Sequence, residues 1–170
     1  MKSLVFLSAV AAIAGLLSGC NISVRLLSFP FNPGGRSLNS SASELTPQVA
    51  SRYIVFASDR RGSQDVYLFD AIDQQLINLP GLNGLDMVAS HPAISENGRY
   101  IVFAGTRQGR SGIYLYDRET QQLRNLTENL LAEVRNPTIS ADGSKIAFES
   151  SENGQWDIRV YDKSGQPLQF

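Results

Sequence analysis

Short apolar runs rich in β-branched and aromatic residues alternate with polar turns along most of this chain, and this pattern predicts strands. The clearest unit, residues 98–117, reads GRYIVFAGTRQGRSGIYLYD and has two such runs on either side of a glycine-bearing loop. Residues 52–70 and 144–162 have the same layout. After Cys20, the best helical spacing of apolar residues is at 128–135, where we expect at most one helical turn. The pattern therefore predicts an all-β fold.

The three units form an internal repeat with a spacing of 45 to 47 residues between corresponding positions. The anchors that keep this spacing are Pro47, Pro92 and Pro137; Phe56, Phe103 and Phe148; Gly62, Gly109 and Gly154; and Asp70, Asp117 and Asp162. Repeats of about 40 to 50 residues are typical of propeller blades or of another array of stacked units.

Each repeat has room for four short antiparallel strands, which is the layout of a propeller blade. Asn97-Gly98 predicts a type I′ hairpin turn between the first two strands of the second repeat, with positive φ at both residues. The third repeat has Asp142-Gly143 at this turn, whereas the first repeat is two residues shorter there. The predicted repeat domain covers residues 46–170, with blades at about 46–80, 91–127 and 136–170.

Three blades leave the two ends of the array to be covered. Each blade buries one face of its sheet against each neighbour, so the outer faces of an open arc would expose apolar side chains. Closed propellers use about four to eight blades. We therefore expect a partial or open propeller, which a homodimer of two copies would complete to about six blades. An open arc, or docking onto another protein, is the alternative.

The first twenty residues have a different pattern. Lys2 precedes an apolar run that is short for a membrane span, and small residues follow it, as in an export signal. Leu17-Ser18-Gly19-Cys20 is similar to the lipobox of bacterial lipoprotein precursors. The resemblance implies removal of a signal peptide at residues 1–19 and lipidation of Cys20 on its thiol, as in palmitoylation, and on its new amino group. An ordinary signal peptide with an incidental cysteine is the alternative.

Residues 20–45 are predicted to be a lipid-anchored flexible tether because they are rich in proline, glycine and serine and show no sustained period. Their apolar residues could pack on the domain or lie near lipid headgroups; these are Leu26, Leu27, Phe29 and Phe31. Asn21 follows the cysteine where aspartate would favour retention in the inner membrane. By analogy with familiar lipoproteins, we expect a periplasm-facing position on the outer rather than the inner membrane, or the cell surface.

Composition and single residues argue against several classes of function. The formal charge of −1 offers no bulk attraction for nucleic acid, and one cysteine with one histidine cannot form a disulfide framework or a metal site of several such ligands. His91 occupies a slot filled by Thr46 and Asn136 in the other repeats, and no Gly-x-Ser-x-Gly motif is present. We expect no enzyme, no metal and no cofactor. A carboxylate-dependent hydrolase is the remaining catalytic alternative.

The aspartates in the loops are interpreted as turn caps. Asp59, Asp65 and Asp157 have the chemistry of a general acid or a calcium ligand, but the other repeats do not keep them, and no EF-hand spacing is present. Aspartate side chains commonly accept hydrogen bonds from nearby backbone N–H groups in turns. We expect that role here. Asp70, Asp117 and Asp162 recur in the three repeats because each ends a strand and opens a turn, which is also a structural role.

The third repeat resembles a known family. Residues 139–148 read ISADGSKIAF and closely resemble the repeats of TolB-type propellers, and Ser58-Asp59-Arg60 and Asp65-Val66-Tyr67 add to the likeness. The resemblance covers about residues 46–170. It implies a propeller and a protein-binding role in the cell envelope, in its most specific form one like that of the Tol–Pal system. Similar repeats also form the propellers of some serine peptidases.

Loops that differ between the repeats are the candidate binding surface. The loops joining the second and third strands share one face with the connections between blades. The candidate residues are Arg60, Arg61, Arg107, Arg110 and Trp156, with Trp156 and Tyr114 as stacking platforms for a sugar ring. The connections add further residues to this face, namely Leu82, Leu85, Met87, Leu130, Leu131 and Arg135. Trp156 fills a slot that holds Gln64 and Ser111 in the other repeats, so we expect it to be exposed rather than folded over its own blade. The sequence thus predicts a non-enzymatic lipoprotein that binds another envelope protein; a module for cell-wall glycan or a small ligand is the alternative.

Overall fold

The computed structural model describes residues 36–169, and this part of the chain contains eleven strands and no helix. The described residues belong to one compact unit, 31–170. The predicted signal peptide, Cys20 and the tether up to residue 35 lie outside the described residues. Within residues 36–169 there is accordingly no helix that is long and apolar enough to cross a membrane.

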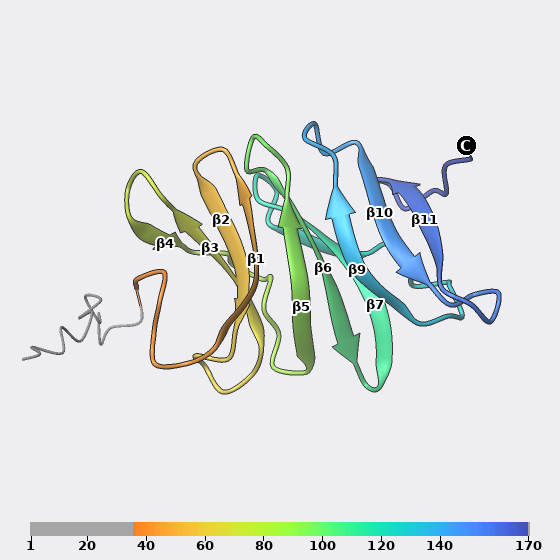
Figure 1. The fold of residues 1–170 in the computed structure, drawn as a ribbon, viewed down its shortest axis with the longest axis horizontal. Coiled ribbons are helices and arrows are strands. Elements are labelled where there is room, and N and C mark those ends of the chain that lie inside the picture. The colour runs from red at the N-terminus through yellow and green to blue at the C-terminus, as the bar shows by residue number, and fades with distance from the viewer. Residues whose placement is uncertain (1–35, 170) are drawn as a thin grey trace, which may run out of the picture. The chain divides into compact units, whose positions relative to one another are not determined.

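The strands form three antiparallel sheets, one for each repeat (Figure 1). The first sheet contains β1 (Glu44–Ala50), β2 (Tyr53–Ser58), β3 (Asp65–Asp70) and β4 (Gln75–Ile77). The second contains β5 (Met87–Ile94), β6 (Tyr100–Arg107), β7 (Arg110–Asp117) and β8 (Gln122–Asn125). The third contains β9 (Val134–Ile139), β10 (Lys145–Ser150) and β11 (Asp157–Asp162). Each sheet is a meander in which consecutive strands pair, so the prediction of three propeller-type blades is confirmed.

The fourth strand of the third blade is reduced to one isolated bridge between Tyr161 and Pro167. The Leu168 N–H also donates a hydrogen bond to the Val160 carbonyl oxygen, 2.8 Å away. The first strand of the array begins at Glu44, two residues before the predicted start of the repeats at residue 46.

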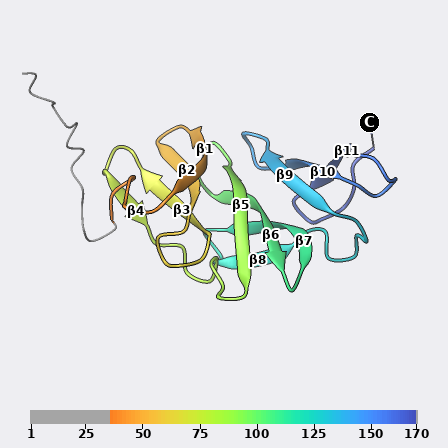
Figure 2. The ribbon, with the colours of Figure 1, turned by 60° about the horizontal axis from the view of Figure 1, so that its bottom comes forward.

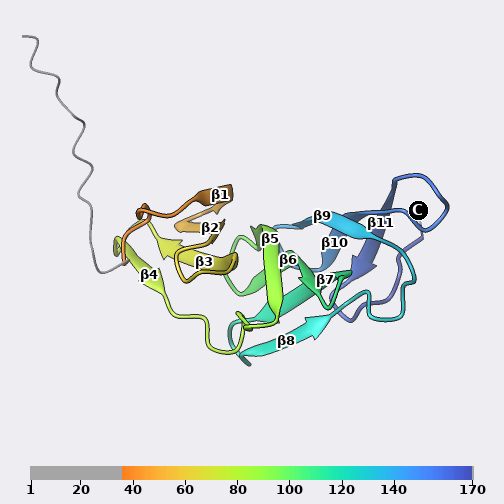
Figure 3. The ribbon, with the colours of Figure 1, turned by 90° about the horizontal axis from the view of Figure 1, so that it is seen from below.

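The three blades lie side by side, with β1, β5 and β9 toward one side of the array and β4 and β8 toward the other (Figures 2 and 3). We call the face of a blade that points to the preceding repeat its leading face, and the opposite face its trailing face. Phe56, Phe103 and Phe148 stand at corresponding positions on the three leading faces.

Two apolar cores fill the junctions between blades. At the first junction, Val55, Val66 and Leu68 of the first trailing face pack in one cluster with Phe103 and Tyr114 of the second leading face. The second junction repeats this arrangement one blade later. Its members include Val102, Ile113 and Leu115 on one side and Ile146 and Phe148 on the other. Burial of each such side chain is worth about 1.5–3 kcal/mol, so the junctions rather than the single blades hold the array together.

A tyrosine at the start of β2 fixes the first junction. The Tyr53 ring lies against the β5–β6 hairpin, where a Cβ atom on Gly98 would fall 2.1 Å from the ring's Cε2 atom. The Arg118 guanidinium lies 5.1 Å from the centre of this ring, and Arg118 also donates a hydrogen bond to the Gly98 carbonyl oxygen. Because Gly98 also has a φ of 71°, a larger residue there would meet both steric and backbone strain.

The second junction has the same arrangement, which we call the tyrosine latch. A Cβ atom on Gly143 would fall 2.5 Å from Cδ2 of Tyr100, and Lys163 Nζ lies 5.5 Å from the centre of that ring. The outer faces of residues 36–169 lack the parts of a latch. Lys145 replaces the tyrosine in the third blade, and Ala71 replaces the cation in the first blade.

The β5–β6 hairpin corrects one prediction. The Gly98 N–H donates to the Ser95 carbonyl oxygen, but of the two predicted residues only Gly98 has a positive φ. Asn97 instead accepts hydrogen bonds from the Ser95 hydroxyl and the Arg99 N–H through its side-chain oxygen. The type I′ prediction was wrong because this loop is longer than two residues, which relaxes the need for two left-handed residues.

Candidate binding surfaces

The loops between second and third strands lie on the same side of the array as the connections that lead into β5 and β9, at the lower edge of Figure 1. We call this surface the loop face. An ion pair of 2.6 Å between Arg107 Nε and Asp86 Oδ2 joins the β6–β7 hairpin to the first connection. A hollow of about 490 Å³ next to the second connection is lined by Arg110, Leu131 and Ser151 among others. The structure therefore brings together the two sets of loops, as predicted.

Hydrogen bonds connect the loop of one blade to the first strand of the next. The Ala89 N–H donates to the Gln64 carbonyl oxygen at 2.8 Å, and the Val134 N–H donates to Ser111 Oγ at 2.9 Å. Trp156 occupies the corresponding slot in the third blade. Its ring is exposed, and the Arg135 guanidinium lies over it at 3.8 Å from the centre.

Apolar side chains are exposed on the loop face. Leu85 is fully exposed and Leu131 almost so, each in a connection that leads into the next blade. Trp156, just before β11, is also exposed, and so is Val88 near the start of β5. The sequence placed both leucines in the connections on this face, together with Leu82 and Met87, which are buried in the structure. It did not tell the exposed members from the buried ones, because no period marks a buried face in irregular segments.

Arg60 lies in a different environment from the other candidate arginines. Its side chain is 7% exposed and forms an ion pair of 2.6 Å with Glu44. It donates hydrogen bonds to the carbonyl oxygens of Ser37 and Leu38, at 3.1 and 3.0 Å. Its guanidinium lies 4.7 Å from the centre of the Tyr67 ring. Arg60 therefore covers the leading face of the first blade and does not belong to the exposed loop surface.

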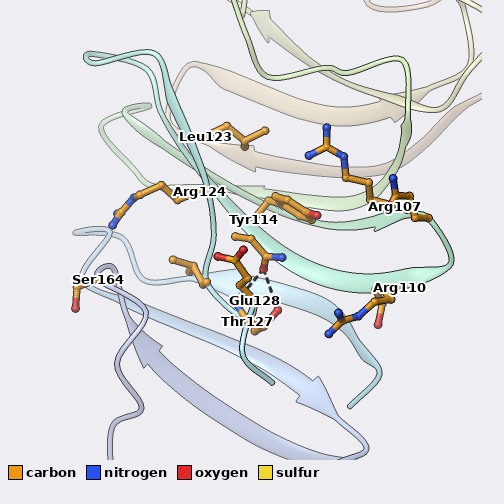
Figure 4. A pocket seen from close by; sticks show the side chains of 12 residues that line it. Arg107, Arg110, Tyr114, Leu123, Arg124, Thr127, Glu128 and Ser164 are labelled. Atoms are coloured by element: carbon orange, nitrogen blue, oxygen red, sulfur yellow. Dashed lines mark hydrogen bonds between the residues drawn. The ribbon is translucent and has the colours of Figure 1, made fainter. Parts of the chain in front are cut away.

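The remaining candidates line two grooves beside the outer strands. Arg107, Arg110 and Tyr114 contribute to a groove of about 690 Å³ along β7 and β8 (Figure 4). Figure 4 shows Arg107 and Arg110 toward one end of this groove and Arg124 toward the other. Arg61 helps to line a groove of about 780 Å³ at the corresponding place in the first blade. Because the groove recurs in the blade geometry, it does not by itself mark a specific ligand site.

The two predicted stacking platforms are already engaged. Tyr114 is buried and stacks on Phe103 with the ring centres 5.5 Å apart. Arg135 lies over the Trp156 ring. A sugar ring would thus have to displace existing contacts at both positions.

The three loop aspartates predicted to cap turns make other contacts: Asp59 accepts a hydrogen bond from the Ser43 N–H, and Asp65 and Asp157 accept hydrogen bonds from side chains.

The aspartates that end the third strands do cap the turns that follow them. Asp70 accepts hydrogen bonds from the N–H groups of Ile72 and Asp73, and Asp117 accepts one from the Glu119 N–H. The Arg99 side chain and then the Glu119 N–H lower the pKa of Asp117, with burial opposing them.

The pKa of Asp65 is raised, in contrast to that of Asp117. Burial raises its pKa, which a hydrogen bond from Ser63 and the charge of Arg61 only partly offset. Within residues 36–169, no cluster of three or more histidine, cysteine, aspartate or glutamate side chains could hold a metal ion.

His91 lies at a β-bulge. The pairing of β5 with β6 shifts between Ser90 and Ala93, and His91 in the bulge has a φ of 48°. Thr46 and Asn136, the corresponding residues of the other blades, have φ values of 48° and 50°. The slot is thus a backbone feature of every repeat.

The trailing face of the third blade is a second uncovered surface. Ile158 on β11 is 68% exposed, whereas the corresponding Val66 and Ile113 are 1% and 0% exposed because the next blade covers them. Val160 and Ala147 lie beside each other on the same face, in paired positions of β11 and β10. An ion pair of 2.6 Å between Arg135 and Glu149 borders this apolar strip.

Comparison with known proteins identifies the fold. No family model and no curated protein matches the sequence. TolB from Acinetobacter baumannii is similar in structure, with a TM-score of 0.59 and 24% identity over 78% of this chain and 34% of TolB. A putative TolB from Agrobacterium tumefaciens has a TM-score of 0.56 and 20% identity, over 70% of this chain and 43% of that one.

A protease propeller is similar to the same extent. The β-propeller domain of the Trilobed protease from Pyrococcus furiosus, described as having an open velcro topology, has a TM-score of 0.56 and 16% identity. The match covers 75% of this chain and 42% of that one. The chain thus spans between 34% and 43% of the length of these three structures. Residues 36–169 have a TolB-like β-propeller fold, built here from three blades that do not close.

Proposed function

We propose that this protein is a non-enzymatic, protein-binding propeller module of the bacterial cell envelope, held at the membrane by a lipidated Cys20. The observation that carries the proposal is the exposure of Leu85, Leu131 and Trp156 on one loop face. Exposed apolar side chains that gather on one surface are typical of interaction sites. The lipobox-like segment and the TolB-like fold support the envelope location.

The partner that fits this surface is a protein with apolar side chains and a partly acidic rim. Arg107 and Arg110 lie at the β6–β7 hairpin, beside the connections that carry the leucines. Trp and Arg are enriched among the residues that dominate protein interfaces. The resemblance to TolB makes a Tol–Pal-like partner the first to look for.

Site-specific photo-crosslinking in living cells tests the proposal. A photoreactive phenylalanine analogue replaces Leu131 in one strain and Ile72 in another. Ile72 is the matched control because it is exposed too, but in the β3–β4 turn at the opposite end of the first blade. We expect a discrete crosslinked partner from position 131 and none from position 72.

A binding measurement with the identified partner completes the test. Leu85→Asp with Leu131→Asp should weaken its affinity at least about tenfold, whereas Ile72→Asp should leave it unchanged. Equal crosslinking from positions 131 and 72, or equal affinities of the two variants, would show that the loop face is not the binding surface.

A further inference from the structure

A short segment before the first blade seals its leading face. Leu38 packs against the cluster formed by Phe56, Tyr67 and Phe69 on that face. Arg60 extends over the same cluster, with its guanidinium 5.2 Å from the centre of the Phe56 ring. We call residues 36–43 the cap. They belong to the predicted tether, and in the structure they are packed on the first blade.

Polar contacts anchor the cap at its middle and at its end next to β1. The Ser40 hydroxyl donates a hydrogen bond to Glu44 Oε1 at 2.6 Å, and the same oxygen pairs with Arg60. The Ser43 N–H donates to Asp59 Oδ1 at 2.9 Å. The cap therefore depends on a small number of bonds, most of which involve Arg60 or its partner Glu44.

The surface under the cap is of the type that a preceding blade covers elsewhere in the chain. Phe56, Tyr67 and Phe69 correspond to Phe103, Tyr114 and Tyr116 of the second blade, which the first trailing face buries. The cap thus occupies the place that a preceding trailing face takes at the internal junctions. Leu38 supplies the apolar contact there.

The uncovered trailing face of the third blade is the counterpart of this surface. Ala147, Ile158 and Val160 correspond to Val55, Val66 and Leu68, which pack on a leading face at the first junction. At the edge of this surface, Lys145 stands where the internal junctions have a tyrosine. In the first blade, the turn after the third strand carries the exposed Asp73, which forms an ion pair of 2.8 Å with Arg52.

We propose that the cap competes with the third blade of a second copy for the leading face of the first blade. With the cap in place, residues 36–169 of one copy form a single three-bladed unit. When the cap detaches, two copies join head to tail through both pairs of faces and close a ring of about six blades, a size within the usual range for propellers. The contact uses faces other than the loop face and does not depend on the function proposed above.

The test measures how many copies of the full lipidated chain, or of its variants, assemble in detergent. Size-exclusion chromatography with light scattering gives this number once the mass of the bound detergent is separated from that of the protein. Leu38→Asp with Arg60→Ala detaches the cap. Arg61→Ala is the matched control, since Arg61 is exposed next to Arg60. We expect one copy for the wild type and for the control, and two copies for the cap variant. Ile158→Asp added to the cap variant should restore one copy.

Photo-crosslinking identifies the faces and remains informative if the cap variant folds poorly. A photoreactive phenylalanine analogue at Ile158 is incorporated in the milder single variant Arg60→Ala, which loosens the cap without placing a charge in the apolar cluster, and equal amounts of ¹⁴N- and ¹⁵N-labelled protein are mixed. Crosslinks between a light and a heavy chain that join position 158 to the first blade near Phe56 and Tyr67 support the proposal.

Three results would overturn it. One is a folded cap variant that remains a single copy. Another is an assembly that Ile158→Asp does not dissolve, or one larger than two copies. The third is a set of crosslinks from position 158 that never joins a light chain to the first blade of a heavy chain.

Discussion

The two outer faces of the array differ in how they meet solvent. The leading face of the first blade is covered by the cap and Arg60, whereas the trailing face of the third blade leaves Ile158 exposed. Both faces carry the apolar residues that a neighbouring blade would bury. The repeat itself therefore does not determine whether the apolar face of an outer blade is buried. A segment outside the repeat, or a partner, determines it.

The largest difference in stability is expected between alanine variants of two corresponding isoleucines, one on a covered trailing face and one on the uncovered trailing face. Ile113→Ala removes a fully buried side chain from the second junction and should lower the free energy of unfolding by about 4 kcal/mol. Ile158→Ala, at the corresponding exposed position, should change it by less than about 0.5 kcal/mol. Urea unfolding of the full chain, followed by circular dichroism, measures both. Similar losses for the two variants would mean that the third trailing face is covered in solution.

The latch glycines give the next largest effect. Gly98→Ala places a Cβ atom within 2.1 Å of the Tyr53 ring, and it also imposes positive φ on a residue with a side chain. We expect a loss of about 3 kcal/mol, since backbone strain of about 1–2 kcal/mol adds to the steric displacement. Gly62→Ala is the control for strain alone, because Gly62 has a φ of 88° but nothing within 4 Å of its Cβ position. Thermal unfolding should therefore show a larger fall in melting temperature for Gly98→Ala than for Gly62→Ala. Equal falls would show that the contact between Gly98 and Tyr53 does not stabilise the junction.

Arg60 and Arg107 stand at corresponding positions but have different roles. Arg60→Ala should cost about 2 kcal/mol, because it removes charged hydrogen bonds from the cap and leaves the partly buried Glu44 without this cation. Arg107→Ala should cost less than about 1 kcal/mol, since its ion pair with Asp86 is exposed. Chemical denaturation compares the two variants. The reverse order of losses would contradict the structural role of Arg60.

The smallest effect is expected from Asp142, in the β9–β10 hairpin where Gly143 packs against Tyr100, and it should depend on pH. The Ser140 hydroxyl and the Ser144 N–H lower the pKa of Asp142 to about 2. Because this value lies below the usual pKa of about 4, ionised Asp142 adds stability above about pH 4, and the contribution is lost as the pH falls toward about 2. Asp142→Asn should lower the melting temperature slightly near neutral pH and make no difference at about pH 2. A difference that persists at about pH 2 would assign the effect to packing instead of charge.

The strands could be predicted from the sequence because the forces that define them are local. Short apolar runs rich in β-branched and aromatic residues, as in Tyr53–Ser58 and Tyr100–Arg107, with glycine and aspartate at the turns, determine where strands begin and end. The candidate surface was only partly predictable. Trp156 stood out against its counterparts in the other repeats, but Leu85 and Leu131 lie in connections where no period distinguishes exposed from buried positions.

Arg60 shows why the remainder needed the structure. In the sequence it is one of several loop arginines, aligned with Arg107. Its role depends on the backbone of Ser37 and Leu38, more than twenty residues away, and on two aromatic rings of the blade that it covers. Contacts at that separation leave no periodic trace in the chain.

By itself, the sequence determined the repeat, the three antiparallel blades and the turn-capping aspartates, because strand periodicity and turn chemistry act over a few residues. Only the tertiary structure decided which apolar faces are covered. Val66, Ile113 and Ile158 have the same place in the repeat and nearly the same chemistry, yet one of the three is exposed. Burial depends on what lies against a side chain, and for the outer blades that neighbour is not specified by the repeat.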